Sequence, residues 1–187
     1  MTIPILWLVG SIGTGKSDTS FHVFSRLFRT GTPVARLDLD DVGMCHPAPV
    51  DDPENHRVKA EAMAATWSVF ERHGATCFVI SGGINTPDVA ALYTDRLPNA
   101  DWTIVRLRIG ADERRDRTIR RGRLLGQDTQ TVEQWIQTGI EEEVSLDTLG
   151  FAEQVIDTDG MDQQQVVDAV LKQTGWPTAM RPSPAGS

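Results

Sequence analysis

The stretch Gly10–Ser17, with the sequence GSIGTGKS, constrains the fold of this chain more than any other. It follows an apolar run at Ile3–Val9 that has the length of a buried strand, and it precedes Asp18–Arg29, where apolar residues recur at helical spacing. Strand, glycine-rich turn and helix form the context in which the pattern GxxxxGK(S/T) binds phosphate, because glycines let consecutive N–H groups point into one concavity. The helix N-terminus adds partial positive charge there. We therefore expect Lys16 to reach the β- and γ-phosphates of a nucleoside triphosphate and the Ser17 hydroxyl to bind Mg²⁺.

Beyond this loop, short apolar runs alternate with segments of helical periodicity. The pattern predicts strands at 34–39, 76–80, 102–109 and 154–156, and helices at 53–73, 86–93, 112–121, 131–149 and 162–173. Strands that alternate with helices predict right-handed βαβ units. We therefore expect a three-layer α/β fold, with a five-stranded parallel sheet and helices on both faces. In such sheets ligands bind beyond the carboxyl ends of the strands.

Length and composition limit the range of functions. The 187 residues predict one domain at 1–173 and a flexible tail at 174–187, which is rich in Pro, Ser and Gly. The net charge of −8 argues against a general nucleic-acid binder. The two cysteines have no metal-ligand or disulfide spacing, and the apolar N-terminal run is too short for a membrane span. We expect a cytoplasmic monomer or homodimer without nucleic-acid or membrane partners.

Carboxylates follow the second predicted strand. Asp38 and Asp40 lie two residues apart, so on a strand they would share a face. One of them can accept a proton from a substrate hydroxyl while the other holds a magnesium-bound water or the substrate, and Asp40 is the predicted metal ligand. Asp41 points the other way and is expected to cap a turn. Arg57, at the start of the next helix, favours an anionic acceptor. The alternative is that the carboxylates only cap a loop.

Glycines mark two further places. Gly82 and Gly83 directly follow the third strand, where they allow close approach of the backbone to a substrate or form a plain turn. Gly122 and Gly126 interrupt a basic segment, as hinges would. Ser81 stands where an ATPase motor or GTPase would normally carry an acid, and this argues against a hydrolase or switch.

An arginine cluster follows the fourth strand. Six arginines lie between residues 114 and 123 of an otherwise acidic chain. Arg117, Arg120 and Arg121 are related by three and four residues on a helix, and Arg114 lies on the same side one turn earlier. The cluster predicts a basic lid at about 112–126, with Arg117 and Arg121 as clamps on the transferring phosphate. The alternative is a solvated basic face of a helix.

With these residues placed, the chain resembles the P-loop kinases that phosphorylate small molecules, over residues 3–173. The group includes adenylylsulfate, shikimate and gluconate kinases and the chloramphenicol phosphotransferase type. Gly10–Ser17 matches their phosphate loop, also called Walker A. Leu37–Val42 resembles the segment of adenylylsulfate kinases that binds substrate and helps to organise the metal. Gly43 stands where those enzymes carry an arginine, so we do not expect adenylylsulfate as the acceptor.

The remaining motifs of the resemblance lie further along the chain. Val79–Gly83 is similar to the glycine pair that contacts the acceptor in shikimate kinases. The lid arginines of the group fall at Arg117, Arg120 and Arg121. Val155–Thr158 resembles the last strand and the loop near adenine, which implies that Asp157 contacts the nucleotide.

The resemblance implies an ATP- and Mg²⁺-dependent kinase that acts on a hydroxyl of a small molecule, a metabolite, natural product or antibiotic. The alternatives are a nucleoside or nucleotide kinase and a nucleotide-binding switch or sensor. The predicted catalytic residues are Lys16, Asp38, Asp40, Arg117 and Arg121. The predicted nucleotide-binding residues are Gly10, Ser11, Ile12, Gly13, Thr14, Gly15, Lys16, Ser17, Asp18, Arg117, Arg121 and Asp157. The predicted acceptor-binding residues are Asp38, Asp40, Arg57, Gly82 and Gly83, and the predicted metal ligands are Ser17 and Asp40.

Overall fold

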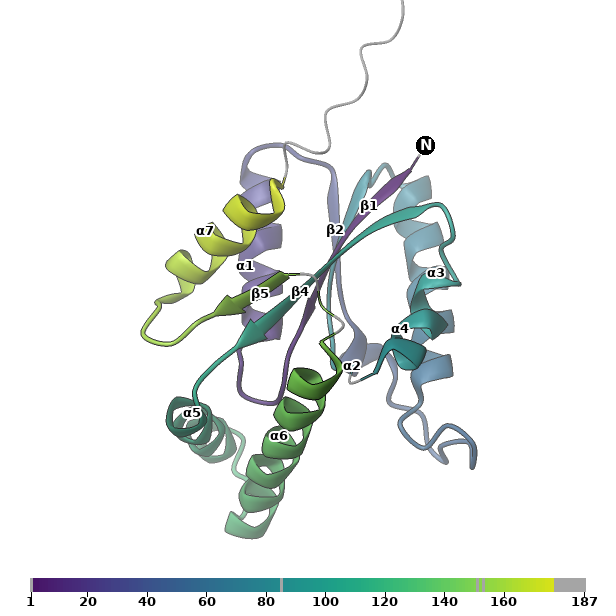
Figure 1. Ribbon diagram of the computed structural model, residues 1–187. Coiled ribbons are helices and arrows are strands. Elements are labelled where there is room, and N and C mark those ends of the chain that lie inside the picture. The colour runs from purple at the N-terminus through teal and green to yellow at the C-terminus, as the bar shows by residue number, and fades with distance from the viewer. Residues whose placement is uncertain (1, 85, 151, 153, 177–187) are drawn as a thin grey trace, which may run out of the picture.

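A five-stranded parallel sheet forms the centre of the computed structural model, which describes residues 2–84, 86–150, 152 and 154–176 (Figure 1). The strands are β1 (Ile3–Val9), β2 (Val34–Asp38), β3 (Cys77–Ser81), β4 (Ala100–Arg108) and β5 (Gln154–Asp157). Their order in the sheet is β2-β3-β1-β4-β5, and every neighbouring pair is parallel. The predicted fold class is therefore confirmed. The central position of β1 places the loop that follows it at the middle of the sheet's carboxyl edge.

Helices cover both faces of this sheet. They are α1 (Lys16–Arg29), α2 (Leu39–Val42), α3 (His56–Arg72), α4 (Pro87–Thr94), α5 (Ala111–Leu124), α6 (Thr129–Leu149) and α7 (Gln163–Thr174). Helices α1 and α7 lie on one face and α3 and α4 on the other, whereas α5 and α6 extend beyond the carboxyl ends of the strands (Figure 1). None of the described helices is long and apolar enough to span a membrane.

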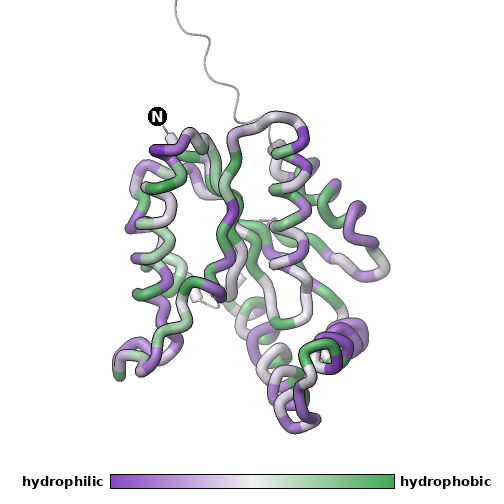
Figure 2. Tube along the Cα trace, turned by 180° about the vertical axis from the view of Figure 1, so that it is seen from behind, coloured by the Kyte–Doolittle hydropathy of each residue, from purple (hydrophilic) through white to green (hydrophobic). Residues whose placement is uncertain are grey.

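The core has two halves because the sheet is covered on both sides. On β1, Ile5 and Trp7 pack toward α3 and α4, while Leu6 and Leu8 pack toward α1 and α7, and all four are fully buried. A strand buried on both faces has a continuous apolar sequence. Figure 2 shows hydrophobic residues along the central strands and mostly hydrophilic residues on α5. The helix that carries the arginine cluster thus lies outside the core.

The end of β2 differs from the prediction. The strand ends at Asp38, and residues 39–42 form the short helix α2. The side chain of Asp38 accepts a hydrogen bond from the backbone N–H of Asp40 at 3.1 Å, as an N-cap residue does. The expectation that Asp38 and Asp40 share a strand face is therefore wrong. Their positions depend on the cap of a helical turn.

Gly122 is not a hinge. Helix α5 continues through it to Leu124, and Gly122 is buried. A Cβ atom at this position would lie 2.3 Å from Cγ2 of Val132 on α6, so the glycine allows the two helices to pack closely. Gly126, with φ +66°, forms the turn after α5. The predicted lid is consequently one half of a packed helix pair.

The folded unit extends beyond the predicted boundary at 173. Helix α7 ends at Thr174, and Trp176 is 5 % exposed within the core cluster between the sheet and helices α1 and α7. Residues 174–176 therefore belong to the domain and not to the tail. The rest of the expected tail, 177–187, lies outside the described residues.

Candidate functional site

The loop between β1 and α1 has the backbone conformation of a phosphate-binding turn. Gly13 and Gly15 adopt φ values of +89° and +84°, which L residues with side chains rarely reach. Gly15 directly precedes α1, so the first N–H groups of that helix have no partner within the helix. The Thr14 hydroxyl closes the turn by donating to the Ser11 carbonyl oxygen at 2.9 Å. The loop thus presents free donors and the positive end of a helix to the same space.

A cavity of about 600 Å³ lies at this loop. Its walls come from Gly13–Thr19, from Arg117, Arg120, Arg121 and Leu124 of α5, and from Gln163 and Val166 of α7. Four basic side chains of the lining, including Lys16, face one acidic side chain, Asp18. The structure thus brings Gly13–Asp18 of the predicted nucleotide-binding residues and the two predicted clamp arginines into one cationic cavity. Of the other predicted loop residues, Ser11 is buried, and Gly10 and Ile12 line a different cavity. Gln163 and Val166 were not predicted, since no local motif marks the start of the last helix as a ligand contact.

The clamp arginines are held in place by side chains of the helix pair. Nε and Nη2 of Arg117 donate to Oε1 of Glu113 at 3.1 and 2.6 Å, and this pairing lowers the pKa of Glu113. The guanidinium carbon of Arg121 lies 5.7 Å from the ring centroid of Trp135, within cation–π range. Both arginines are therefore positioned toward the cavity before a ligand arrives.

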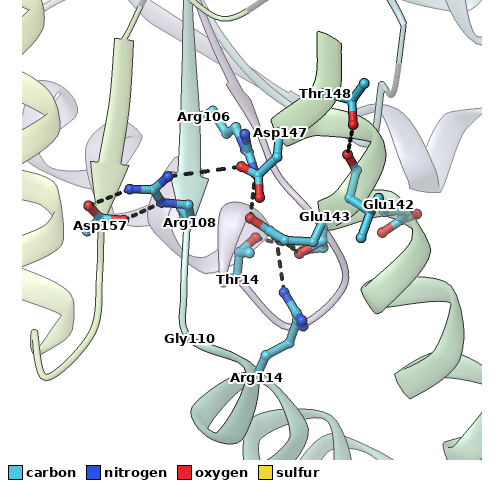
Figure 3. A network of polar contacts seen from close by, with 12 residues as sticks. Thr14, Arg106, Arg108, Gly110, Arg114, Glu142, Glu143, Asp147, Thr148 and Asp157 are labelled. Atoms are coloured by element: carbon cyan, nitrogen blue, oxygen red, sulfur yellow. Dashed lines mark hydrogen bonds and ion pairs between the residues drawn. The ribbon is translucent and has the colours of Figure 1, made fainter. Parts of the chain in front are cut away.

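Arg114, the first arginine of the cluster, does not line the phosphate cavity. It is buried, and its Nη1 atom lies 3.2 Å from Oε2 of Glu143 on α6 (Figure 3). Oε1 of Glu143 accepts a hydrogen bond from Arg106 of β4 at 2.5 Å, and Oε2 accepts one from the Ser11 hydroxyl at 2.6 Å. Arg114 lies toward the phosphate loop, as Arg117 does, but Glu143 pairs with its guanidinium group and Arg114 does not line the cavity. Glu143 instead links the phosphate loop to β4 and α5.

Glu142 is a second contact of α6 with the loop. Its Oε2 atom accepts a hydrogen bond from the Ile12 N–H at 2.8 Å, and it points to a different side of α6 from Glu143 (Figure 3). Burial raises the pKa of Glu142 above its ordinary value. Neither residue was predicted. The run of three glutamates at 141–143 is the only local signal, and it is equally typical of a solvated helix.

A second cavity, of about 220 Å³, also has Lys16 in its lining. Its ionisable lining consists of Lys16, Asp40, Glu54, His56, Lys59 and Glu142. Lys16 lines this cavity and the phosphate cavity alike. A small molecule in the second cavity would therefore lie next to the phosphates bound by the loop.

Asp38 and Asp40 have separate environments. Asp40 is about half exposed and lines the second cavity, with Oδ1 3.8 Å from Nζ of Lys59. Asp38 is buried, and its Oδ2 accepts a hydrogen bond from the Ser81 hydroxyl at 3.0 Å and lies 3.4 Å from Nη2 of Arg36. The structure thus brings Asp40, and not Asp38, into the cavity.

The contact between Asp38 and Ser81 also changes the argument against a switch. Ser81 ends β3, and Asp38 is its register partner on β2. A carboxylate therefore does stand at the end of β3, although the neighbouring strand supplies it. The presence of a serine at position 81 therefore does not by itself exclude a hydrolase.

The two glycines after β3 have different surroundings. A Cβ atom at Gly82 would lie 2.7 Å from Cβ of Leu39, so this glycine permits the packing of α2 on the sheet. Gly83 lines the second cavity. The prediction that both approach a substrate thus fits Gly83 only.

Two further predicted residues lie away from the cavity walls. Nη2 of Arg57 lies 2.6 Å from Oδ1 of Asp51, and this pairing lowers the pKa of Asp51. Asp157 accepts two hydrogen bonds from Arg108, at 2.5 and 2.9 Å, and its pKa is lowered as a result. Neither residue lines a cavity described above. The predictions of Arg57 as an acceptor contact and of Asp157 as a nucleotide contact are therefore not supported. Arg57 pairs with Asp51, which no motif marks, and Asp157 pairs with Arg108 on the neighbouring strand.

The donor set at the loop is compatible with Mg²⁺. Among the described residues, no group of three His, Cys, Asp or Glu side chains could hold a metal ion by itself. Mg²⁺ commonly binds through few protein oxygens together with phosphates and waters. The hydroxyl of Ser17 at the phosphate cavity and the carboxylate of Asp40 beyond Lys16 are donors of this kind.

The sheet, the glycine loop and the α5–α6 pair define a P-loop kinase fold. Searches of protein-family models and of curated proteins find no match. Among solved structures, a tunicamycin resistance protein from Deinococcus radiodurans matches with a TM-score of 0.63 and 22 % identity, over 92 % of this chain and 96 % of that chain.

Two matching structures are kinases by name. A sugar kinase from a Janibacter species has a TM-score of 0.60 and 16 % identity, over 98 % of this chain and 100 % of its own. A shikimate kinase from Acinetobacter baumannii, in complex with shikimate, has a TM-score of 0.57 and 18 % identity, over 97 % of both chains. The predicted resemblance to P-loop small-molecule kinases is confirmed at the level of the fold.

Proposed function

We propose that this protein is an ATP- and Mg²⁺-dependent kinase that transfers the γ-phosphate to a hydroxyl group of a small molecule. One observation carries the proposal: Lys16 lines a cationic cavity suited to a triphosphate and also a second cavity that contains Asp40. Phosphoryl transfer needs a phosphate cradle and a positioned nucleophile on opposite sides of the transferred group. The two cavities that share Lys16 would provide these two places.

Each residue then has a chemical task. The Lys16 ammonium stabilises negative charge that develops on the transferred phosphoryl group, and Arg117 and Arg121 hold the phosphate oxygens from α5. Asp40 orients the hydroxyl and accepts its proton. Asp38 is a positioning residue, because its carboxylate caps the helical turn that carries Asp40.

Mg²⁺ would be held by Ser17, with Asp40 as the nearby carboxylate. When bound, the ion neutralises charge on the β- and γ-phosphates. Location in the cytoplasm and the state of a monomer or homodimer stay predictions.

The test is release of ADP from ATP with Mg²⁺, alone and with a library of hydroxylated metabolites that includes nucleosides and nucleoside monophosphates. Marked stimulation by one compound supports the kinase, and stimulation by a nucleoside or its monophosphate would assign the alternative acceptor class. Release of ADP that no compound stimulates would favour the switch or sensor instead.

Lys16→Met should abolish transfer, because it removes the only described residue shared by the two cavities. The matched control is Lys172→Met, at an exposed position near the end of α7. Retained turnover in Lys16→Met, with folding shown intact by circular dichroism, would refute the assignment.

A further inference from the structure

The two cavities that share Lys16 differ in the charge of their other walls. Lys16 aside, the phosphate cavity has three arginines against the single carboxylate of Asp18. The second cavity has three carboxylates, from Asp40, Glu54 and Glu142, against the single ammonium of Lys59. A bound triphosphate would occupy Lys16, and Mg²⁺ would neutralise charge on its β- and γ-phosphates, so the remaining carboxylates set the charge of the second cavity. An anionic acceptor would thus meet repulsion from these three carboxylates.

The basic side chain that remains in the second cavity already has a partner. Nζ of Lys59 lies 3.8 Å from Oδ1 of Asp40, and the side chain is only 16 % exposed. Its carbon chain lies against Gly43, where an added Cβ atom would come within 2.0 Å of Cγ. The direction of Lys59 is therefore set by packing, and its charge is directed to Asp40. Arg57, which could have attracted an anion, pairs with Asp51 outside the cavity.

The other two carboxylates come from separate elements. Oε2 of Glu142 accepts a hydrogen bond from the Ile12 N–H. Oε2 of Glu54 lies 3.0 Å from Nε2 of His56, and Nδ1 of the same ring lies 2.8 Å from the Tyr93 hydroxyl. Burial raises the pKa of Glu142, and the like charges of Asp40 and Glu54 add to the effect. A cation in the cavity would relieve this repulsion and form charge-assisted hydrogen bonds with the carboxylates.

From this lining we infer that the acceptor is a compact alcohol with a protonated amine, such as an amino alcohol or an amino sugar, and not a carboxylate or phosphate compound. The inference rests on the proposed function, because it names the acceptor class of that same site. The position of the acceptor site follows from the cavity that Lys16 lines, and the charge of the acceptor follows from the other ionisable side chains of that cavity. The volume of about 220 Å³ lies below the roughly 300–1,000 Å³ of sites for drug-sized ligands, which favours a compact molecule.

The test uses two sets of alcohols matched in size, each with an ammonium, a neutral and a carboxylate member. One set is serinol, glycerol and glycerate, and the other is glucosamine, glucose and glucuronate. Binding is measured by ligand-observed NMR on the full chain with Mg²⁺ and a non-hydrolysable ATP analogue, and ADP release is measured separately with ATP. The variants are Glu142→Gln, whose amide oxygen can still accept the Ile12 N–H, and Glu54→Gln. Glu141→Gln is the control, because Glu141 is exposed on the same helix.

We expect the ammonium member of at least one set to bind roughly tenfold more tightly than its neutral partner, and the carboxylate member to bind least. Glu142→Gln or Glu54→Gln should remove most of this selectivity, and Glu141→Gln should preserve it. Equal binding across the charge classes, preference for the carboxylate, or no binding of any member overturns the inference.

The two proposals fail in different ways. Stimulation of ADP release by a carboxylate compound would support the kinase and overturn the cationic acceptor. Selective binding of the ammonium compounds, when no compound of the metabolite library or of the two matched sets stimulates ADP release from ATP, would count against the kinase. The same result would support the charge preference of the cavity.

Discussion

Replacement of Glu143 tests the link between α6 and the phosphate loop. The Glu143 carboxylate contacts Arg106, Arg114 and the Ser11 hydroxyl, and the side chains of Glu143, Arg106 and Arg114 are 12, 5 and 8 % exposed. Surface ion pairs contribute about 0–1 kcal/mol, whereas removal of one partner from a buried pair costs about 3–5 kcal/mol. Glu143→Gln keeps the shape and one acceptor oxygen but removes the charge opposite two buried guanidinium groups.

A second carboxylate reduces the loss of stability that we expect for Glu143→Gln. Oδ1 of Asp147 remains 2.8 Å from Nη2 of Arg106 and compensates part of that charge. We therefore expect Glu143→Gln to lower the free energy of unfolding by about 2–4 kcal/mol. In a domain of this size, each kcal/mol of lost stability lowers Tm by about 2–4 °C, so Tm should decrease by roughly 5–15 °C. Because Ser11 belongs to the loop, the affinity for nucleotide should fall as well.

The assay is thermal unfolding followed by circular dichroism, with and without an ATP analogue and Mg²⁺. Glu141→Gln is the matched control, since surface substitutions on the same helix usually change stability by no more than about 0.5 kcal/mol. If Glu143→Gln and Glu141→Gln lower Tm equally, the reasoning about the buried link is wrong.

Three further predictions follow from the same geometry. Asp40→Asn should remove turnover while ATP affinity measured by calorimetry stays nearly unchanged; loss of ATP binding would show that Asp40 serves the metal and not the hydroxyl. Gly122→Ala should lower the free energy of unfolding measured with urea by about 1–3 kcal/mol, because the added Cβ would lie 2.3 Å from Cγ2 of Val132, and an unchanged midpoint would contradict this. The pKa of Glu142 is raised in the folded state, so the unfolded chain ionises first; wild-type stability relative to Glu142→Gln should fall as pH rises above the ordinary value of 4.5, and a pH-independent difference in Tm would contradict this.

The sequence by itself determined the architecture and the phosphate loop. Ile3–Val9 and Gly10–Ser17 carry local signals, apolar continuity in a strand and glycines at the positions that need φ above zero, and these signals do not depend on distant residues. The alternation of strands and helices then restricts the topology to a parallel sheet with covered faces. The helical spacing of Arg117 and Arg121 placed them together, and both line one cavity, while their role as phosphate clamps stays a prediction.

Only the tertiary structure decided which polar side chains face the cavities. Arg114 and Arg117 lie one turn apart, yet Arg117 lines the phosphate cavity and Arg114 does not, because Glu143 of α6 pairs with Arg114 in the interior. Ser11 and Glu143 are 132 residues apart in the chain, so no local period could relate them. Charged side chains form ion pairs with the groups that tertiary packing places beside them. Those groups depend on how the helices pack against the sheet and against one another.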